Sequence, residues 1–362
     1  MSEDQFHQSL DAFYSSGRNF SCSFLAVTYF VTAIGEKSDD AFGKGSSLLH
    51  KVFAEGTATS VQAVILAVLY KQSMNERNLA WLLLGAGIRI SQSLALHLPN
   101  KRNPQDSHHQ LQWKRRLWYS IYELEQVLAC SLGRPSGIVG ISSAEVPIQA
   151  LGTYGNEYTP PGYCVATATF ARVLHNIRDR IYTSSEDQAP SEQTIGELIQ
   201  EVEKWWDAVP AHLKATDTMP PSQARAVCCL GLRYNYALIL LTRPHLLYSV
   251  THSDGWPPEI LERVRVCETA SNQSVTILLE MARRDVLSDS VWFDTDYIIC
   301  TGIVLFLRGL RTPADDVLAK ARDLMPLLEM TRKSFLGNYT FETLSGLLND
   351  LDFREFNIVP QE

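Results

Sequence analysis

The chain has 362 residues, of which 45% are hydrophobic and 20% are charged, and its formal net charge is −8 at pH 7. This composition is typical of a globular protein with a large core and excludes a disordered tail. Because the balance is acidic, the overall charge gives the chain no attraction for phosphate backbones, and we expect it to bind nucleic acid poorly on its own.

The N-terminus begins MSEDQFHQSL, which is acidic and polar and lacks the basic and apolar regions of a secretion signal. We interpret residues 1–20 as a short polar segment. The longest apolar runs, 61–70 and 297–307, are shorter than the roughly 20 residues that a membrane span needs, so we expect no membrane association.

Helical periodicity dominates the rest of the chain, and alternating β-branched runs are nearly absent. The pattern predicts an all-α fold: a single large multi-helix domain of roughly a dozen packed helices. In chain order, the predicted helices span residues 21–35, 41–54, 60–71, 76–97, 107–132, 163–183, 191–209, 221–241, 258–283, 291–308, 314–335 and 341–351. We expect residues 352–362 to form a C-terminal tail.

Two connectors divide these helices most clearly. Residues 98–106 form a polar loop, and residues 147–162 contain three prolines and three glycines in the longest irregular segment. Neither segment is long enough for a flexible interdomain linker. The organisation is therefore one helical domain, or two tightly packed halves that meet near 147–162.

Two apolar helices are predicted to end at an arginine that precedes proline, in Leu132-Gly133-Arg134-Pro135 and Leu241-Thr242-Arg243-Pro244. Proline disfavours the α conformation in the residue before it, and Gly133 can adopt the left-handed cap conformation. We expect both arginines to be oriented by the turns that follow.

The cysteines show no arrangement that is typical of a metal site or a disulfide framework. There are seven of them, with no C-x-x-C pair, and most lie inside apolar runs. This pattern indicates reduced packing thiols in a nuclear or cytosolic protein. We therefore expect no metal cofactor in this chain. The cysteines are Cys22, Cys130, Cys164, Cys228, Cys229, Cys267 and Cys300.

Motifs of enzyme active sites are missing from the sequence. Gly85-Ala86-Gly87 lacks the third glycine and the strand context of a dinucleotide fingerprint, so its small residues favour close helix packing. His108-His109 would point to different helical faces and cannot act as a metal-binding pair. Trp205-Trp206 is interpreted as one core ring and one marginal ring. No residue is assigned a catalytic role, and we do not expect an enzyme.

The segment RRLWYSIYELEQVLACSLGRP places a carboxylate on an apolar stripe. Trp118, Ile121, Glu125, Leu128 and Leu132 step by 3, 4, 3 and 4, which puts them on one helical face. A buried carboxylate without a partner would cost several kcal/mol, on the order of the transfer penalty for a charged group. We favour a structural ion pair with a cation fixed at a helix end.

Arg134 and Arg243 are the cations that we expect to meet Glu125, because each stands at a predicted helix end. Two other interpretations stay open for the carboxylate: an exposed position at the edge of the seam, or a role in ligand contact or catalysis. If the fold binds an effector, the pocket would be lined by Trp118, Tyr122 and Tyr236, with the two arginines as polar anchors.

The same segment resembles the fungal-specific transcription factor domain, the helical regulatory region of many fungal binuclear zinc-cluster regulators. That family reads Arg-Arg-Leu-Trp-Trp, then Tyr, an Asp-Arg pair, Gly-Arg-Pro, and an acidic residue with proline. Tyr119 replaces the second tryptophan, and Glu125-Gln126 replaces Asp-Arg. The matching positions are Arg115, Arg116, Trp118, Tyr122, Gly133, Arg134, Pro135 and Pro147.

Further segments resemble the family in the same order, including WLLLGAGIRISQSLALH, WWDAVPAHL, YALILLTRPHLL and CETASNQSVTILLE. Together they cover residues 21–351, which the resemblance identifies as the regulatory domain. The zinc cluster of the family requires paired C-x-x-C units, and this chain has none, so zinc would be bound only by a cluster outside it.

The resemblance implies a nuclear transcriptional regulator of metabolic or secondary-metabolite genes, with regulator proteins or the transcription machinery as partners. It also implies that DNA is reached indirectly, or through a zinc cluster outside this chain. A small-molecule effector and a homodimer or heterodimer are compatible with it. Two alternatives stay open: a helical small-molecule-binding or enzymatic protein that reuses the scaffold, and a partner that only dimerises with a full-length regulator.

Overall fold

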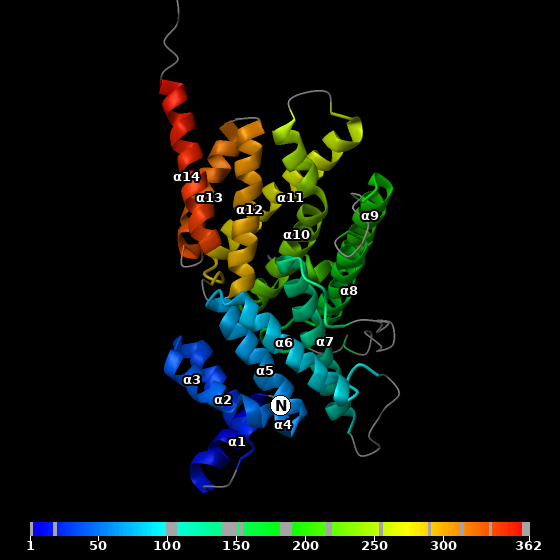
Figure 1. Ribbon diagram of the computed structural model, residues 1–362, viewed down its shortest axis with the longest axis vertical. Coiled ribbons are helices and arrows are strands. Elements are labelled where there is room, and N and C mark those ends of the chain that lie inside the picture. Colours follow the sequence, from blue (N-terminus) through cyan, green and yellow to red (C-terminus); the bar gives the residue numbers. More distant parts are fainter. Residues whose placement is uncertain are drawn as a thin grey trace, which may run out of the picture. The chain divides into compact units, whose positions relative to one another are not determined.

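α-Helices supply the regular structure in the computed structural model, which describes residues 3–16, 20–98, 107–138, 151, 155–181, 190–214, 219–252, 256–288, 291–311, 315–332 and 335–356. Within these ranges there are fourteen α-helices and no strand (Figure 1). The predicted all-α fold is confirmed.

The chain divides into two compact units. The first comprises Met1–Thr153 and Thr167–Arg172, and the second comprises Tyr154–Ala166 and Val173–Glu362. Helix α8 (Tyr163–Ile181) contributes residues to both units. The assignment of residues 21–351 to one regulatory domain stays a prediction.

In the first unit, α5 lies at the centre and packs against α2, α6 and α7. Its core is formed by side chains with no more than 1% exposure, among them Phe30, Val64, Leu84 and Ile121. The helices of this unit are α1 (Glu3–Ser16), α2 (Cys22–Glu36), α3 (Asp39–Ser47), α4 (Leu49–Glu55), α5 (Ala58–Ser73), α6 (Arg77–Ser93) and α7 (His108–Leu132).

Hydroxyl side chains define where several of these helices begin. Ser21 accepts a hydrogen bond from the backbone of Phe24, and Thr57 and Ser107 each form a reciprocal capping box with the third residue of their helix. Each cap satisfies an N–H group that has no partner inside the helix. The predicted start of α7 after Ser107 is confirmed.

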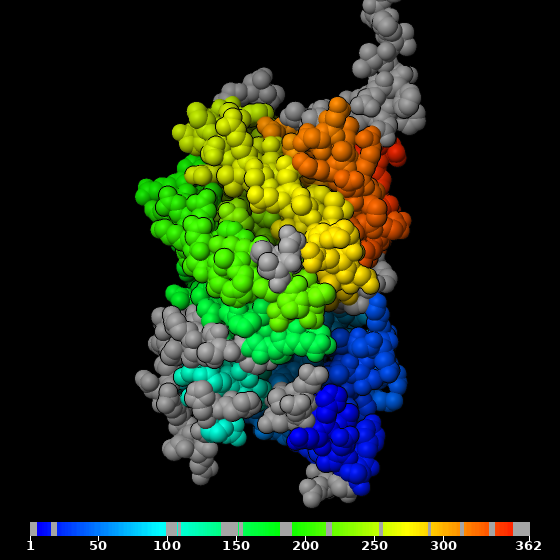
Figure 2. All heavy atoms as spheres, turned by 180° about the vertical axis from the view of Figure 1, so that it is seen from behind, coloured from blue at the N-terminus to red at the C-terminus, as the bar shows by residue number. Residues whose placement is uncertain are grey.

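The second unit is built around α10 (Pro221–Thr251), which packs against α9, α11 and α12. By length and composition α10 could cross a membrane, but 78% of its apolar window is buried within the structure, as in a core helix. Helices α11 and α13 also pack together, and their side chains lie side by side in Figure 2. The other helices are α9 (Glu192–Ala208), α11 (Pro258–Arg283), α12 (Trp292–Arg311), α13 (Asp315–Thr331) and α14 (Phe335–Phe356).

The predicted helix end before Pro244 is wrong, because α10 continues through this proline to Thr251. Proline removes one backbone hydrogen bond and strains the preceding turn, a local cost of about 3 kcal/mol. Tertiary contacts outweigh that preference, since Leu246 and Ser249 are buried and His245 bonds to Glu192.

Other boundaries also differ from the prediction, including the ends of the helices predicted at 76–97 and 314–335, which lie at Ser93 and Thr331. The polar N-terminal segment contains α1, and the helix predicted at 341–351 runs from Phe335 to Phe356. The helix predicted at 41–54 is divided at Leu48 into α3 and α4. At this break Gly45 lies directly under the ring of Phe30, where a Cβ atom would come within 2.6 Å of the ring. The close contact explains why glycine is used there.

Candidate functional site

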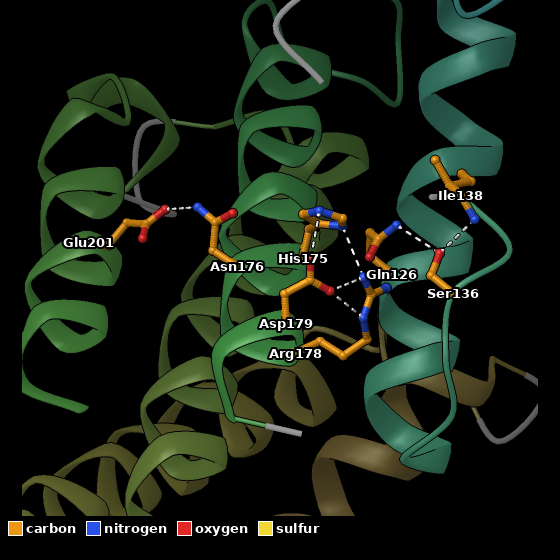
Figure 3. A network of polar contacts seen from close by, with 8 residues as sticks. All are labelled: Gln126, Ser136, Ile138, His175, Asn176, Arg178, Asp179 and Glu201. Atoms are coloured by element: carbon orange, nitrogen blue, oxygen red, sulfur yellow. Dashed lines mark hydrogen bonds and ion pairs between the residues drawn. The ribbon is translucent and has the colours of Figure 1, made fainter. Parts of the chain in front are cut away.

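Glu125 and Gln126 of α7 bind the segment that follows the helix (Figure 3 shows the Gln126 part). The carboxylate of Glu125, 1% exposed, accepts a hydrogen bond of 2.6 Å from the backbone N–H of Gly137. The hydroxyl of Ser136 accepts from the Gln126 amide at 3.4 Å and from the N–H of Ile138 at 3.1 Å. These bonds hold residues 136–138 against α7.

The expected ion pair between Glu125 and Arg134 is not formed. Gly133 ends α7 in the left-handed conformation, with φ of 61°, and this turns the chain back along the helix. Arg134 therefore points to α6, where it bonds to the side-chain oxygen of Asn78 and lies 5.0 Å above the ring of Trp81. The N–H of Gly137, and not Arg134, is therefore the group of this segment that bonds to the buried carboxylate.

The aromatic residues of the seam form a buried cluster in the first unit. Trp118 and Tyr122 are 3% and 2% exposed, and their rings lie 6.2 Å apart. His97 contacts Trp118 at 5.6 Å, and Tyr119 meets Tyr122 edge to face. Burial raises the pKa of Tyr119 well above its ordinary value. These rings form part of the hydrophobic core. Burial of the Tyr122 ring stabilises the fold through the large apolar surface that it removes from water.

Gly87 shows why small residues stand in the Gly-Ala-Gly segment. A Cβ atom at this position would lie 2.9 Å from Val64 of α5 and 3.0 Å from Ile121 of α7. Three helices therefore meet at Gly87, and a side chain would push them apart. The prediction of close helix packing at this segment is confirmed.

A second carboxylate, Glu55, caps the start of α2 from the end of α4. Its oxygens accept from the N–H groups of Cys22 and Ser23 at 2.7 and 3.0 Å, and from the Ser23 hydroxyl. The Ser23 hydroxyl also contacts the hydroxyl of Ser60 at 2.8 Å. Burial raises the pKa of Glu55, but the bonds from Ser23 and Cys22 outweigh it, and the net pKa is lowered.

Sequence reasoning missed this clamp, although one signal was present. Glu55 is the last residue of α4, where a carboxylate faces the negative end of its own helix dipole. An acidic residue at a helix C-terminus is unfavourable locally. Its position therefore pointed to a partner elsewhere, here the positive N-terminal end of α2.

In the second unit, three polar side chains of α8 bond to one another (Figure 3). The guanidinium of Arg178 donates to Nδ1 of His175 at 3.1 Å and to the carboxylate of Asp179. Because arginine can only donate, Nδ1 of His175 must accept, which leaves its proton on Nε2, 3.2 Å from Asp179. Beside this group, Asn176 donates to Glu201 of α9.

This arrangement favours the neutral form of His175. Burial lowers its pKa most, Asp179 opposes that effect, and Arg178 adds to it, so that the net pKa is lowered. Both ring nitrogens are engaged by neighbouring side chains. The imidazole is therefore occupied structurally and is not presented to a substrate.

A partly buried ion pair joins α10 to the start of α12. The guanidinium of Arg225 forms two bonds with Asp294, at 2.7 and 2.8 Å, and a third with the carbonyl of Val286. Asp294 is 0% exposed and also accepts from the N–H of Ser288. Burial disfavours the charge on Arg225, but the bonds to Asp294 prevail and the pKa of Arg225 is raised.

Further polar and aromatic groups surround this pair. Arg233 lies 5.9 Å from the ring of Tyr163, and Tyr236 meets Tyr297 edge to face at 5.7 Å. Burial raises the pKa of the Cys229 thiol to about 11 and also raises that of Tyr297. A thiol with a raised pKa is a poor nucleophile, so this cluster is typical of a polar core.

The six residues predicted for a lock or an effector pocket fall into both units. Trp118, Tyr122, Glu125 and Arg134 belong to the first unit, and Tyr236 and Arg243 belong to the second. Arg243 is exposed on α10 and is not oriented by a turn, because the helix does not end there. Burial raises the pKa of the neighbouring Cys267 thiol to about 12, against smaller opposing effects of Thr242 and Arg243.

The tryptophan pair is arranged as predicted. Trp205 is 7% exposed, and its indole N–H donates to the carbonyl of Ala166 at 3.1 Å. Trp206 lies at the margin and stacks on Tyr234 of α10, with ring centroids 5.1 Å apart. The side chains of His108 and His109 lie outside the described residues.

The cysteines and acidic groups form no recognisable metal site in the described part of the chain. All seven cysteines lie in described helices, and none is joined to another by a disulfide. No group of three or more candidate ligands occurs among the residues that the structure describes. The carboxylates of Glu55, Glu125 and Asp294 are instead engaged in hydrogen bonds that fix helix ends and helix pairs.

Comparison with known proteins finds a family match for the first part of the chain. A family model for the fungal specific transcription factor domain matches residues 7–153, which include α2 to α7 and the Glu125 seam. Residues 7–153 are thus similar to the fungal specific transcription factor domain. The resemblance predicted from the sequence is confirmed over this range.

The chain is also similar to fungal regulators over most of its length. A transcriptional regulatory protein of Schizosaccharomyces pombe is 22% identical over 76% of the chain and 35% of its own length. The lactose regulatory protein of Kluyveromyces lactis is 23% identical over 78% of the chain and 31% of its own length. The acetamidase regulatory protein of Aspergillus fumigatus is 28% identical over 70% of the chain and 32% of its own length.

The chain therefore spans about a third of the length of these curated relatives. The share of the chain that matches is larger than either structural unit, so the similarity extends into both units. No solved structure matches the chain.

Proposed function

We propose that this chain is the regulatory part of a fungal transcriptional regulator and acts through contacts with other proteins and not through catalysis. One observation carries the proposal: similarity to fungal regulators extends into both helical units, beyond the segment that matches the family model. In this role the helices form a stable surface for partners. Glu125, Arg225 and His175 act within the fold, since their bonds go to other parts of the chain.

The proposed targets are genes of metabolism, including secondary metabolism. Two similar proteins are named for lactose and acetamidase regulation, which supports a role in nutrient or metabolite use. The identity of the genes would be set by the DNA-binding part with which this chain works.

The proposed site of action is the nucleus, on partners that are regulator proteins or the transcription machinery. With a net charge of −8, the chain has no bulk attraction for DNA. We therefore propose that it reaches DNA indirectly, or through a zinc cluster outside these 362 residues, and that the chain itself needs no metal. Dimerisation and a small-molecule effector are further elements of the proposal.

Transcript profiling tests this function. The strain that lacks the gene is compared with the same strain after the gene is restored. We expect a restricted set of transcripts, enriched in metabolic enzymes, to change and then to recover. Unchanged transcripts under growth on several carbon and nitrogen sources would contradict the proposal.

A gel-shift measurement tests the DNA part separately. The purified chain at physiological salt is expected to show no sequence-specific shift. A specific shift at nanomolar protein would show that the chain contacts DNA by itself.

A further inference from the structure

The surface where α9 meets α10 carries two stacked aromatic rings. Trp206 and Tyr234 lie 5.1 Å apart with an angle of 24° between their planes. Both residues are only partly buried. The neighbouring ring, Trp205, is buried and donates to the carbonyl of Ala166. The stacking of Trp206 on Tyr234 is therefore not needed to hold the Trp205 indole in place.

Acidic side chains flank these rings. Glu203 and Asp207 lie three residues before and one residue after Trp206 on α9, and both are exposed. Their charges act on Tyr234: its pKa is raised mainly by burial and further by Glu203 and Asp207. An aromatic face beside two carboxylates attracts a cation in two ways, through the ring quadrupole and through direct charge.

The chain itself places a cation on this face. The ammonium of Lys214 lies 5.2 Å from the centre of the Trp206 ring and 3.4 Å from the carbonyl oxygen of Asp207. Lys214 is exposed and follows the short 3-10 helix Ala211–Leu213. Its ammonium shows which chemistry the ring face accepts.

We propose that Trp206, Tyr234, Glu203 and Asp207 form a docking surface for a lysine-bearing segment of a partner protein, whose ammonium replaces that of Lys214. A protein segment fits this surface better than a free amine. The rings are open at the surface, so a single amine would gain one weak contact. A segment can place one lysine on Trp206 and a second near the carboxylates. This inference does not depend on the transcriptional role.

Nuclear magnetic resonance on the purified full chain tests the proposal. The probe is the peptide acetyl-Gly-Lys-Gly-Lys-Gly-amide, and the matched control is the same peptide with both lysines acetylated. We expect the lysine peptide to shift the indole N–H signal of Trp206 with weak affinity and the acetylated peptide to leave it unchanged. The Trp206→Phe variant assigns that signal.

Two lysine variants separate a specific site from general charge. Lys214→Ala removes the internal competitor and should tighten binding by about two- to five-fold, the change that one exposed cation–π contact represents. Lys204→Ala removes the same charge from α9 away from the ring and should change affinity less. Glu203→Gln with Asp207→Asn should weaken binding without disturbing the core.

The outcomes are distinct. The docking surface is supported if Lys214→Ala binds the lysine peptide more tightly and Lys204→Ala does not. Binding should also be lost in Trp206→Leu while the amide signals of that variant stay as well dispersed as those of a folded protein. If Trp206→Leu fails to fold, the Glu203→Gln and Asp207→Asn variant decides, because its sites are exposed. Equal effects of Lys204→Ala and Lys214→Ala, equal binding of the acetylated peptide, or no shift in Lys214→Ala would each overturn the proposal.

Discussion

The carboxylate of Glu125 accepts a 2.6 Å hydrogen bond from the backbone N–H of Gly137, twelve residues further along the chain. This bond joins the middle of α7 to the segment beyond its end. It also gives the carboxylate, which is 1% exposed, a hydrogen-bond donor on an otherwise apolar seam. The carboxylate holds the backbone of Gly137 in place. A buried acceptor without a donor would instead destabilise the fold.

Removing this acceptor should destabilise the first unit. Glu125→Leu leaves the N–H of Gly137 without its carboxylate, and an unsatisfied buried donor costs about 1–3 kcal/mol. Glu125→Gln keeps a carbonyl oxygen and should lose less. Arg134→Ala should cost about 1 kcal/mol or less, because its contacts to Asn78 and Trp81 are near the surface. Urea unfolding measures all three, and a loss for Arg134→Ala as large as that for Glu125→Leu would restore the ion-pair interpretation.

The cap that Glu55 forms on α2 should be sensitive to acid. Its pKa is lowered in the folded state from an ordinary value of 4.5, so its contribution to stability is complete above that value. The contribution is lost as the pH falls through the lowered pKa of the folded state. Glu55→Gln should therefore be less stable than the parent at pH 7 and approach it below pH 4.5.

Hydrogen exchange localises this effect. At pH 7 the amides of Cys22 and Ser23 should exchange faster in Glu55→Gln than in the parent. Unchanged protection of both amides would show that the carboxylate does not hold the start of α2.

His175 should resist protonation. Its pKa is lowered by burial, and an unfolded chain takes up the proton near the ordinary value of 6.5. The contribution of neutral His175 to the free energy of unfolding is therefore fully present above about pH 6.5. It decreases as the pH falls below that value, because the unfolded state then takes up a proton more readily than the folded state. Nitrogen-15 spectra of the imidazole should show a proton on Nε2, with Nδ1 unprotonated.

Asp179→Asn provides a test of direction. Asp179 is the neighbour that raises the pKa of His175, so its neutralisation should lower that pKa further. A rise in the pKa of His175 in this variant would be incompatible with the bonding pattern in α8.

The ion pair of Arg225 and Asp294 should show strong coupling. Because Asp294 is fully buried, removing Arg225 leaves an uncompensated buried charge, at a cost of about 3–5 kcal/mol. Removing Asp294 should cost less, because the Arg225 side chain is 31% exposed and can reach water. Replacing both, by Arg225→Met and Asp294→Leu, should cost much less than the two single changes together. Additive losses in a double-mutant cycle would mean that the two groups act independently.

Glycine positions give a matched pair of substitutions. Gly87→Ala should destabilise by about 1–3 kcal/mol, because its Cβ would meet Val64 and Ile121 at 3.0 Å or less. Gly43→Ala, on an open face of α3, should stabilise by about 0.5–1 kcal/mol, since alanine favours helix and meets nothing within 4 Å. Thermal unfolding should shift in opposite directions for the two variants.

The sequence carries the local part of this structure well. The hydroxyl of Ser107, the glycine at 133 and the 3-4 spacing around Glu125 predict the limits of α7 and its buried face, because caps and periodicity act within a few residues. The family resemblance depends on the same segment. The close approach at Gly87 was also predictable from small residues in an apolar helix.

The features that could not be predicted from the sequence depend on the direction of the chain after a turn and on contacts between residues far apart in the sequence. The left-handed turn at Gly133 decides that Gly137, and not Arg134, reaches Glu125, and this follows from backbone angles. Pro244 is a local helix breaker that packing of α10 overrides. Arg225 and Asp294 are 69 residues apart, so their pairing has no local signal.

A tethering assay tests the central claim most directly, that this chain acts on transcription once it is brought to a promoter. The chain is fused to an unrelated sequence-specific DNA-binding domain, and a reporter is compared with that domain alone at equal protein levels. The account predicts a reproducible rise or fall in reporter transcription, reduced when the fused chain carries the destabilising Asp294→Asn change. A folded fusion that occupies the promoter, yet leaves transcription unchanged on every nutrient source tested, would contradict it.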